Sequence, residues 1–364
     1  MKGLIITHKG MESFCADEVK ELVGAKCKTD DSVVVFDLKP DDLSILAYKA
    51  QSACKVLGLL DSFNVKNLDK DLADSVGRTD LAFLDKDKTF KAEARVDGGY
   101  DGYSAAQLGE LIIDKVRATK KHDQRVDLDN PDEIFFLYVN GKNGYLCIDP
   151  TGTDLSKREY RIFTRATSLK GTVAYLLLRA AGYKKGKVLL DPFCGTGEIP
   201  IEAALYATGT AVNYYRKDAL GNSSGFAKLD RKITTAKNIY GYDSLLHNVK
   251  NAQKNAKIAG IHKSVNFSRQ DIEWLDTKFE AGSVDCIAAN PPDISSRTNL
   301  KEMEKIYREF FHQAEFVLKN KGRAALISGS ERSVELLRQA GLVLESEHSL
   351  WHGKKEEKIL VFRK

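Results

Sequence analysis

The feature that most constrains the fold is a stretch near the middle of the chain, residues 187–204, which reads KVLLDPFCGTGEIPIEAA. A short apolar run ends in Asp191, a tight turn contains Gly195 and Gly197, and an amphipathic helix follows. This order predicts the first strand, loop and helix of a doubly wound α/β domain, in which ligands bind beyond the carboxyl ends of the strands. The turn is not a dinucleotide fingerprint, because the third glycine would fall at Pro200, and no Gly-Lys-Ser/Thr follows to make a P-loop. A G-x-G turn alone fits a structural turn as well as a binding site.

Polar residues at the ends of the later strands give that turn its meaning. The strands predicted in this half of the chain are 187–190, 239–243, 265–268, 284–289, 323–328, 342–347 and 358–362. Asp243 ends the second of them, Asp271 follows the third, and Asn290-Pro291-Pro292 follows the fourth. Because ligands of such folds bind at the carboxyl ends of the strands, we expect these groups to surround one ligand. A carboxylate after the second strand can accept both ribose hydroxyls of a nucleoside cofactor, and Asp271 can accept its adenine amino group.

The N-terminal half predicts a smaller α+β arrangement with no visible catalytic motif. Strands are expected at 3–7, 32–38, 89–96, 133–140 and 144–149, and helices at 11–23, 41–60 and 104–119. The long helix 41–60 opens with the acidic pair Asp41-Asp42 after Pro40, a typical start signal. Ser104 suits the N-cap of the third helix. We expect a first module to end near Asn67.

The composition permits a nucleic-acid partner and argues against several other classes. The chain has 364 residues, a net charge of +5 and six cysteines without a C-x-x-C pair. Scattered cysteines disfavour a zinc site or a disulfide framework and suit a reducing compartment, so we expect no bound metal. No apolar run reaches the length of a membrane span, and the N-terminus lacks the apolar core of a signal peptide. We therefore expect a cytoplasmic protein of two or three domains.

Basic residues cluster in two places that suit contact with nucleic-acid phosphates. Lys120, Lys121 and Arg125 follow the helix 104–119. The segment 156–170 contains a single acid, Glu159, and the basic residues Lys157, Arg158, Arg161, Arg165 and Lys170. A charge run is usually a solvated face, but this one marks a junction between two predicted domains, where an RNA could bridge them. Each phosphate neutralised adds about 0.9 to the salt dependence of binding to a duplex.

Several short motifs, in the right order, resemble one family of RNA-modifying enzymes. The sequence VDLDNPD at 126–132, with Gly152, Leu155 and KREYR at 157–161, resembles the THUMP domain. DPFCGTG at 191–197, IPIEAA at 199–204 and the N-P-P motif resemble class I S-adenosylmethionine-dependent methyltransferases, and within them the THUMP-bearing tRNA guanine-N2 methyltransferases. The resemblance covers nearly the whole chain.

That resemblance implies a fold and a domain order. The C-terminal domain would be a seven-stranded Rossmann-like α/β methyltransferase domain, preceded by an α+β region with ferredoxin-like and THUMP parts. We expect a ferredoxin-like module at 1–67, the THUMP domain at 68–155, a basic linker at 156–170 and the methyltransferase domain at 171–364. The resemblance also implies a tRNA partner gripped near its acceptor end, and a monomer.

Site residues follow from the same resemblance. The residues expected to bind S-adenosyl-L-methionine are Asp191, Phe193, Cys194, Gly195, Thr196, Gly197, Asp243, Asp271 and Asn290. Those expected at the acceptor site, where the base amine donates to the Asn290 oxygen and the Pro291 carbonyl, are Asn290, Pro291, Pro292 and Asp293. The residues expected to contact RNA are Lys120, Lys121, Arg125, Lys157, Arg158, Arg161, Arg165 and Arg297.

Two positions depart from the family pattern and leave an alternative open. Asp293 stands where amino-methylating members carry an aromatic residue that stacks on the flipped base, and Glu198 stands where relatives carry a small residue. Stacking is worth about 1–3 kcal/mol per base, and another ring, such as Phe163 or Trp351, could take over this role. Asp293 could instead accept hydrogen bonds from the Watson–Crick edge of the base, with Arg297 paired to it or stacked on the base. The alternative function is an RNA-binding protein that retains the cofactor pocket but has altered or lost methyl transfer.

Overall fold

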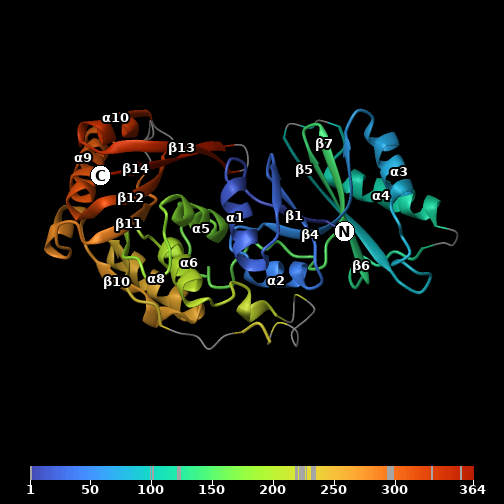
Figure 1. Ribbon diagram of the computed structural model, residues 1–364, viewed down its shortest axis with the longest axis horizontal. Coiled ribbons are helices and arrows are strands. Elements are labelled where there is room, and N and C mark those ends of the chain that lie inside the picture. Colours follow the sequence, from blue (N-terminus) through green and yellow to red (C-terminus); the bar gives the residue numbers. More distant parts are fainter. Residues whose placement is uncertain are drawn as a thin grey trace.

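The computed structural model in Figure 1 describes residues 2–98, 100, 102–120, 124–217, 220, 226, 228–230, 235–292, 299–328, 331–352 and 355–364. Within them the chain forms two seven-stranded sheets, one from each half of the sequence. The N-terminal half, blue to green, and the C-terminal half, yellow-green to red, lie beside each other along the long axis of the molecule (Figure 1). None of the described helices is both long enough and apolar enough to cross a membrane.

The N-terminal half is one continuous sheet with the order β2-β3-β1-β4-β7-β6-β5. Its elements are β1 (Lys2–Ile6), α1 (Glu12–Val23), β2 (Cys27–Asp30), β3 (Val33–Asp37), α2 (Asp42–Lys49), β4 (Lys55–Asn64), α3 (Leu68–Arg78), β5 (Phe90–Asp97), α4 (Ala105–Thr119), β6 (Glu133–Asn140) and β7 (Asn143–Ile148). Strand β4 pairs with β1 from Lys55 to Leu59 and with β7 from Gly58 to Asn64, so it joins the two parts of the sheet. The two expected modules, 1–67 and 68–155, therefore share a sheet.

The helix predicted at 41–60 is wrong in its second half. Helix α2 ends at Lys49, and the apolar run after it forms strand β4. A short apolar run fits a buried strand as well as a helix. Here the carboxylate of Glu18 in α1 accepts the backbone N–H of Gln51 (2.8 Å) and of Ser52 (2.9 Å), groups that a continued helix would have bonded internally.

The C-terminal half forms the seven strands expected from the sequence. Its elements are α5 (Gly171–Ala180), β8 (Leu189–Asp191), α6 (Glu198–Thr208), η1 (Tyr214–Arg216), β9 (Ile239–Asp243), α8 (Leu246–Ile258), η2 (His262–Ser264), β10 (Asn266–Arg269), η3 (Ile272–Thr277), β11 (Val284–Ala289), α9 (Leu300–Val317), β12 (Leu318–Ser328), α10 (Glu331–Gln339), β13 (Val343–His352) and β14 (Lys355–Arg363). The order is β10-β9-β8-β11-β12-β14-β13. The first five strands are parallel and β14 is antiparallel to both neighbours. The strand order reverses between β8 and β11, the place where doubly wound sheets bind ligands.

Helices cover both faces of this sheet, and successive strand residues alternate between them. Leu189 and Cys286 face the core built with α5, α6 and α8, whereas Leu190 and Ile287 face the core built with α9 and α10. The alternation follows from the two-residue period of a strand. Burial on both faces explains why these strands read as continuous apolar runs.

A hairpin of the C-terminal sheet joins the two halves. Strands β13 and β14 extend over helix α1 (Figure 1), where Phe14 meets His348 with ring centroids 5.3 Å apart. A Cβ added to Gly10 would lie 1.9 Å from the Ser349 carbonyl oxygen, so only glycine allows this approach. Met11 and Leu350 are buried in the same apolar cluster. The halves are thus packed against each other.

Candidate functional site

Asp191 ends strand β8 at the centre of the sheet and is fully buried. Its Oδ1 accepts the backbone N–H of Phe193 (3.1 Å), whereas its Oδ2, also buried, has no hydrogen-bond partner among the described residues. Burial raises the pKa of this carboxyl well above its usual range, and the nearby Asp243 and Glu198 raise it further. A buried acceptor without a partner is rare in folded proteins and indicates a missing donor.

The turn after Asp191 has the backbone that its glycines predict. Gly195 and Gly197 have φ values of 52° and 90°, in the left-handed region. A Cβ on Gly197 would lie 2.9 Å from the Cβ of Ala252 in α8, whereas one on Gly195 would meet no atom within 4 Å. The turn is therefore packed against the protein at Gly197 and open at Gly195.

Asp243, at the end of β9, holds this turn in place. Its Oδ2 accepts the Gly195 N–H (3.0 Å), and its Oδ1 accepts from the backbone of Leu245 (2.9 Å) and from Asn248 Nδ2 (2.8 Å). The backbone N–H of Cys194 donates to the Tyr242 carbonyl (2.8 Å) in the same strand. The expected contact with a ribose would add to these bonds.

The other residues expected near the cofactor occupy the same edge. Asp271 follows β10, is exposed, and accepts no side-chain hydrogen bond from another described residue. Phe193 packs edge-on against Phe310 of α9, with centroids 5.4 Å apart. Burial raises the pKa of the Cys194 thiol well above its usual range, so this cysteine is not a thiolate nucleophile. Thr196 is buried and donates to the Glu198 carboxylate (2.8 Å).

Asn290 follows β11, the strand next to β8. Its Nδ2 donates to the Thr167 carbonyl (3.3 Å), and among the described residues its Oδ1 accepts no hydrogen bond. Pro291 is buried and Pro292 exposed, and the Tyr307 hydroxyl donates to the Pro292 carbonyl (3.2 Å). The N-P-P motif is thus anchored from both sides. Asp293 and Arg297 lie outside the described residues.

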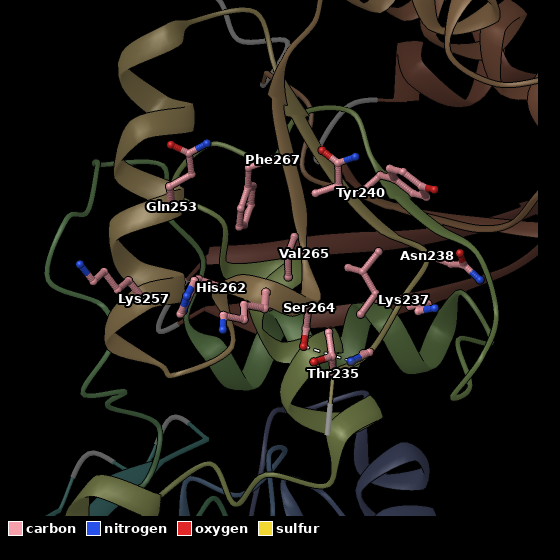
Figure 2. A pocket seen from close by; sticks show the side chains of 14 residues that line it. Thr235, Lys237, Asn238, Tyr240, Gln253, Lys257, His262, Ser264, Val265 and Phe267 are labelled. Atoms are coloured by element: carbon pink, nitrogen blue, oxygen red, sulfur yellow. Dashed lines mark hydrogen bonds between the residues drawn. The ribbon is translucent and has the colours of Figure 1, made fainter. Parts of the chain in front are cut away.

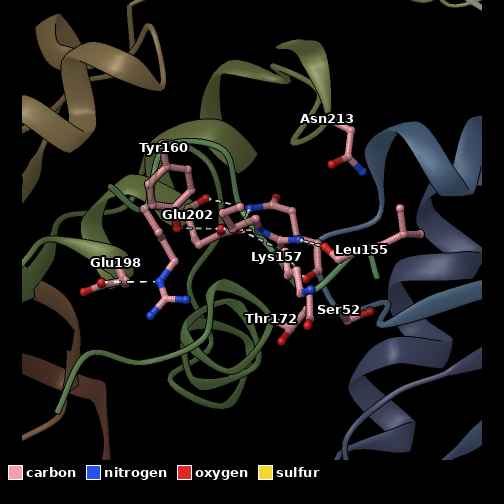
Figure 3. Close-up of polar contacts among 12 residues, drawn as sticks. Ser52, Leu155, Lys157, Tyr160, Thr172, Glu198, Glu202 and Asn213 are labelled. Carbon is pink, nitrogen blue, oxygen red and sulfur yellow. Dashed lines mark hydrogen bonds and ion pairs between the residues drawn. The ribbon is translucent and has the colours of Figure 1, made fainter. Parts of the chain in front are cut away.

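The expectation that Arg158 contacts RNA is wrong. Its side chain is fully buried and pairs with Glu202 of α6 at 2.8 Å (Figure 3). The remaining guanidinium nitrogens donate to the carbonyls of Leu155 (2.6 Å) and Gln51 (2.6 Å). Tyr160 and Gln51 Nε2 donate to the same Glu202 carboxylate, at 2.8 and 2.6 Å. An isolated buried charge is costly, so the basic linker supplies the counter-charge for an acid inside an apolar helix.

The remaining basic residues divide into engaged and exposed ones. Lys120 is half-buried and donates through Nζ to the carbonyls of Leu81 (3.0 Å) and Leu84, so two of its three donors are used within the fold. Arg161 is largely covered and pairs with Glu198 at 3.5 Å. Exposed side chains remain at Arg125, which donates to the Asp87 carbonyl (2.8 Å), and at Lys157 and Arg165. Lys121 lies outside the described residues.

The two rings considered as replacements for the missing aromatic lie in different places. Phe163 belongs to the linker, and Lys254 Nζ lies 4.6 Å from its ring centroid. Trp351 lies at the hairpin that joins the halves, with Lys9 Nζ 5.5 Å from its ring centroid. Trp351 therefore contributes to the interface between the halves.

Two residues of this region were missed from the sequence. Glu202 is a charged residue in the largely buried helix α6, one turn after Glu198, and Asn255 is a polar residue of α8 with 0% exposure. Both could have been found, because a polar side chain in an apolar stripe needs a partner. Their partners are far away in the sequence and could not have been named.

A hollow lies at the opposite edge of the sheet. A depression of about 790 Å³ opens at the amino ends of β9 and β10, lined among others by Lys237, Lys257 and His262 (Figure 2). It contains none of the strand-end acids and so is separate from the site built on Asp191.

Comparison with known proteins decides the family. Residues 158–351, more than half of the chain, match the family model described as RMKL-like, methyltransferase domain. The chain belongs to the RMKL-like methyltransferases. This membership makes S-adenosylmethionine its cofactor, as the strand-end pattern led us to expect.

Individual relatives agree with this membership. The chain is 32% identical over 235 residues to a tRNA (guanine(6)-N2)-methyltransferase of Methanocaldococcus jannaschii, an alignment that spans 62% of this chain and 61% of that protein. It is 26% identical over 364 residues to a protein of the same name from Archaeoglobus fulgidus, spanning 97% and 90%. The structure of a possible methylase from Clostridium difficile 630 superposes with a TM-score of 0.81 at 22% identity, covering 99% and 97%, and shows the shared fold.

The residues present fit the cofactor. S-adenosylmethionine carries an α-ammonium group, and the orphaned Oδ2 of Asp191 is a buried acceptor suited to it. Gly195 leaves room on the turn that follows Asp191, because a Cβ there would meet nothing within 4 Å.

Proposed function

We propose that this protein transfers a methyl group from S-adenosylmethionine to the exocyclic N2 amine of a guanine in tRNA. The names of the two relatives support this substrate. The observation that carries the proposal is the state of Asn290. With Nδ2 bound to the Thr167 carbonyl, the amide is oriented and Oδ1 is left as an acceptor at the end of the strand beside Asp191.

Asn290 and Pro291 would orient the base amine. When bound, the cofactor supplies a methyl group on a sulfonium; the N–C bond forms as the C–S bond breaks, and one amine proton is lost. An amine that donates both N–H groups to protein acceptors aims its lone pair in one direction, so positioning supplies much of the acceleration. The base must leave its stack to reach this edge of the sheet.

The cofactor assignment is residue by residue. We propose that Asp191, Phe193, Cys194, Gly195, Thr196 and Gly197 hold the methionine end, that Asp243 holds the ribose, and that Asp271 holds the adenine amine. The free Asp271 carboxylate and the open side of Gly195 support this.

The N-terminal half would bind the RNA. We propose a ferredoxin-like module at 1–67, a THUMP domain at 68–155 and a linker at 156–170, in a monomeric cytoplasmic enzyme that grips the acceptor region. The exposed side chains of Arg125, Lys157 and Arg165 supply phosphate contacts.

The test is a transfer assay with labelled S-adenosylmethionine on an unmodified tRNA transcript, followed by mass spectrometry of nucleosides. The expected product is N2-methylguanosine. Asn290→Ala should lower the rate at least a hundredfold, the scale of losing one positioned polar group at a reacting centre, while S-adenosylhomocysteine should still bind, because Asp191, Asp243 and Asp271 are unchanged. Asn266→Ala, an exposed asparagine at the opposite edge of the sheet, is the matched control. Binding of tRNA and cofactor without any labelled product would overturn the proposal in favour of a non-catalytic RNA-binding protein.

A further inference from the structure

The linker is bound along the cofactor turn. Two acids of helix α6, Glu198 and Glu202, lie one helical turn apart, and each takes an arginine of the linker (Figure 3). Arg158 and Glu202 form a fully buried ion pair. Arg161 Nε lies 3.5 Å from a Glu198 carboxylate oxygen, and this buried Nε donates no hydrogen bond to a described residue. The first pair is thus hydrogen-bonded, and the second is a longer ion pair.

Asn255 makes a second connection. From α8, its Nδ2 donates to the carbonyls of Phe163 in the linker (3.0 Å) and Thr196 in the cofactor turn (3.0 Å). Its Oδ1 accepts the Phe163 N–H (3.1 Å). One buried side chain therefore joins the linker, the turn and the helix that follows Asp243.

The end of the linker touches both parts of the site. The hydroxyl of Ser168 lies 2.5 Å from that of Thr196, which in turn donates to Glu198. The neighbouring Thr167 carbonyl accepts from Asn290. A displacement of the linker would thus move the cofactor turn and the N-P-P motif together.

We propose that the linker positions the cofactor turn, with Arg161 and Asn255 as its positioning residues, and that it couples RNA binding to cofactor binding. Neither residue needs to touch the cofactor: Arg161 acts through Glu198 and Asn255 through Thr196. The exposed basic side chains of the linker include Lys157 and Arg165, and RNA phosphates would contact these groups. Only this RNA part rests on the proposed function.

The coupling is reciprocal by thermodynamic necessity. If RNA bound to the linker increases the affinity for the cofactor, the bound cofactor must increase the affinity for RNA by the same factor. Coupling factors of roughly 5- to 150-fold are usual for such linked sites.

The first experiment needs no RNA. Calorimetric titration with S-adenosylhomocysteine should show the Kd raised about tenfold in Arg161→Ala and in Asn255→Ala, a change of about 1.4 kcal/mol. Arg161→Lys keeps the charge and should recover most of the affinity. Arg165→Ala, an exposed arginine of the same linker, is the control and should bind within twofold of the native protein.

Urea unfolding separates positioning from loss of fold. Arg161 is partly exposed, so Arg161→Ala should fold and carries the test if Asn255→Ala does not. A native Kd for S-adenosylhomocysteine in a folded Arg161→Ala protein, or equal losses in the alanine and lysine variants, would overturn the positioning role.

The second experiment adds an unmodified tRNA transcript. The transcript should lower the Kd for S-adenosylhomocysteine at least fivefold in the native protein, and less than twofold in Arg161→Ala. Arg165→Ala should raise the Kd for the transcript and leave the Kd for S-adenosylhomocysteine unchanged. Arg161→Ala should raise the Kd for S-adenosylhomocysteine and leave the Kd for the transcript unchanged. Equal cofactor affinity with and without bound transcript would overturn the coupling. Failure of the transcript to bind at all would overturn both the coupling and the tRNA substrate, with the first experiment still standing.

Discussion

Helix α6 and strand β8 each contain a carboxyl group that is 0% exposed, and the hydrogen bonding of the two groups differs. Glu202 in the helix is surrounded by Arg158, Tyr160 and Gln51, so both of its oxygens are hydrogen-bonded. Asp191, just before the turn, has one oxygen bonded and the other without a partner. Both side chains are 0% exposed, so burial alone does not separate structure from function.

The number of hydrogen bonds on each carboxylate distinguishes a buried charge that stabilises the fold from one that is available to a ligand. A buried charge that is paired and hydrogen-bonded contributes to the fold, and removing one partner leaves the other uncompensated. A buried acceptor without a partner costs stability in the free protein and returns that cost when a donor binds.

The largest effect is expected from Arg158, the cation that pairs with the fully hydrogen-bonded Glu202. Arg158→Ala leaves Glu202 buried without its cation, so the free energy of unfolding should fall by about 3–5 kcal/mol. Urea titration at pH 7 measures it, with the exposed Arg165→Ala as a control that should stay within about 0.5 kcal/mol. Adding Glu202→Leu to Arg158→Ala should recover part of the loss. A small loss in the single variant would mean that the pair contributes little to the fold.

A change at Asp191, the carboxyl with an unpaired oxygen, should affect cofactor affinity and not stability. Asp191→Asn keeps the shape but removes the charge, so the Kd for S-adenosylhomocysteine should rise at least tenfold, since hydrogen bonds to charged groups contribute about 1.5–3 kcal/mol. The free energy of unfolding should not fall, because no satisfied contact is lost. Calorimetry and urea titration on the same variant measure both. Native affinity in Asp191→Asn would remove this residue from the cofactor site.

Because the pKa of Asp191 is raised, both the stability of the protein and its affinity for the cofactor should depend on pH. An acid whose pKa is higher in the folded than in the unfolded state destabilises the fold as pH rises from the ordinary Asp value, about 3.9, towards the raised value. The ammonium of the cofactor favours the ionised form, so cofactor affinity should increase with pH across the same window and level off above it. Titrations from pH 4.5 to 8 measure this, and Asp191→Asn should flatten that part of the curve. A native protein with flat affinity over the window would contradict the assignment.

The smallest effects should come from charges that face solvent. Lys157→Ala and Arg165→Ala should leave the free energy of unfolding within about 0.5 kcal/mol. Each should lower the salt dependence of tRNA binding by roughly 0.7–0.9, the contribution of one phosphate contact. Filter binding of a transcript at several salt concentrations measures the slope. An unchanged slope in both variants would mean that RNA approaches from another face.

The strands of the C-terminal half could be predicted well because their pattern is local. An apolar run followed by an acid or by N-P-P marks a strand end wherever it occurs, and all seven strands were found. The stretch 41–60 failed because a run such as Lys55–Leu60 suits a buried strand and a helix alike. Contacts from elsewhere decided it: β1 and β7 flank this segment, and Glu18 takes the N–H groups of Gln51 and Ser52.

The sequence by itself determined the strand–turn–helix at 187–204, the set of acids at one edge of the sheet and the family. Only the tertiary structure decided which charges face a ligand. Arg158 and Arg165 belong to the same basic run, yet one is buried and the other exposed. The reason is distance along the chain: Glu202 lies 44 residues from Arg158 and 151 residues from Gln51, and no local pattern names such partners. A charge is assigned to the fold or to a ligand by what surrounds it after folding.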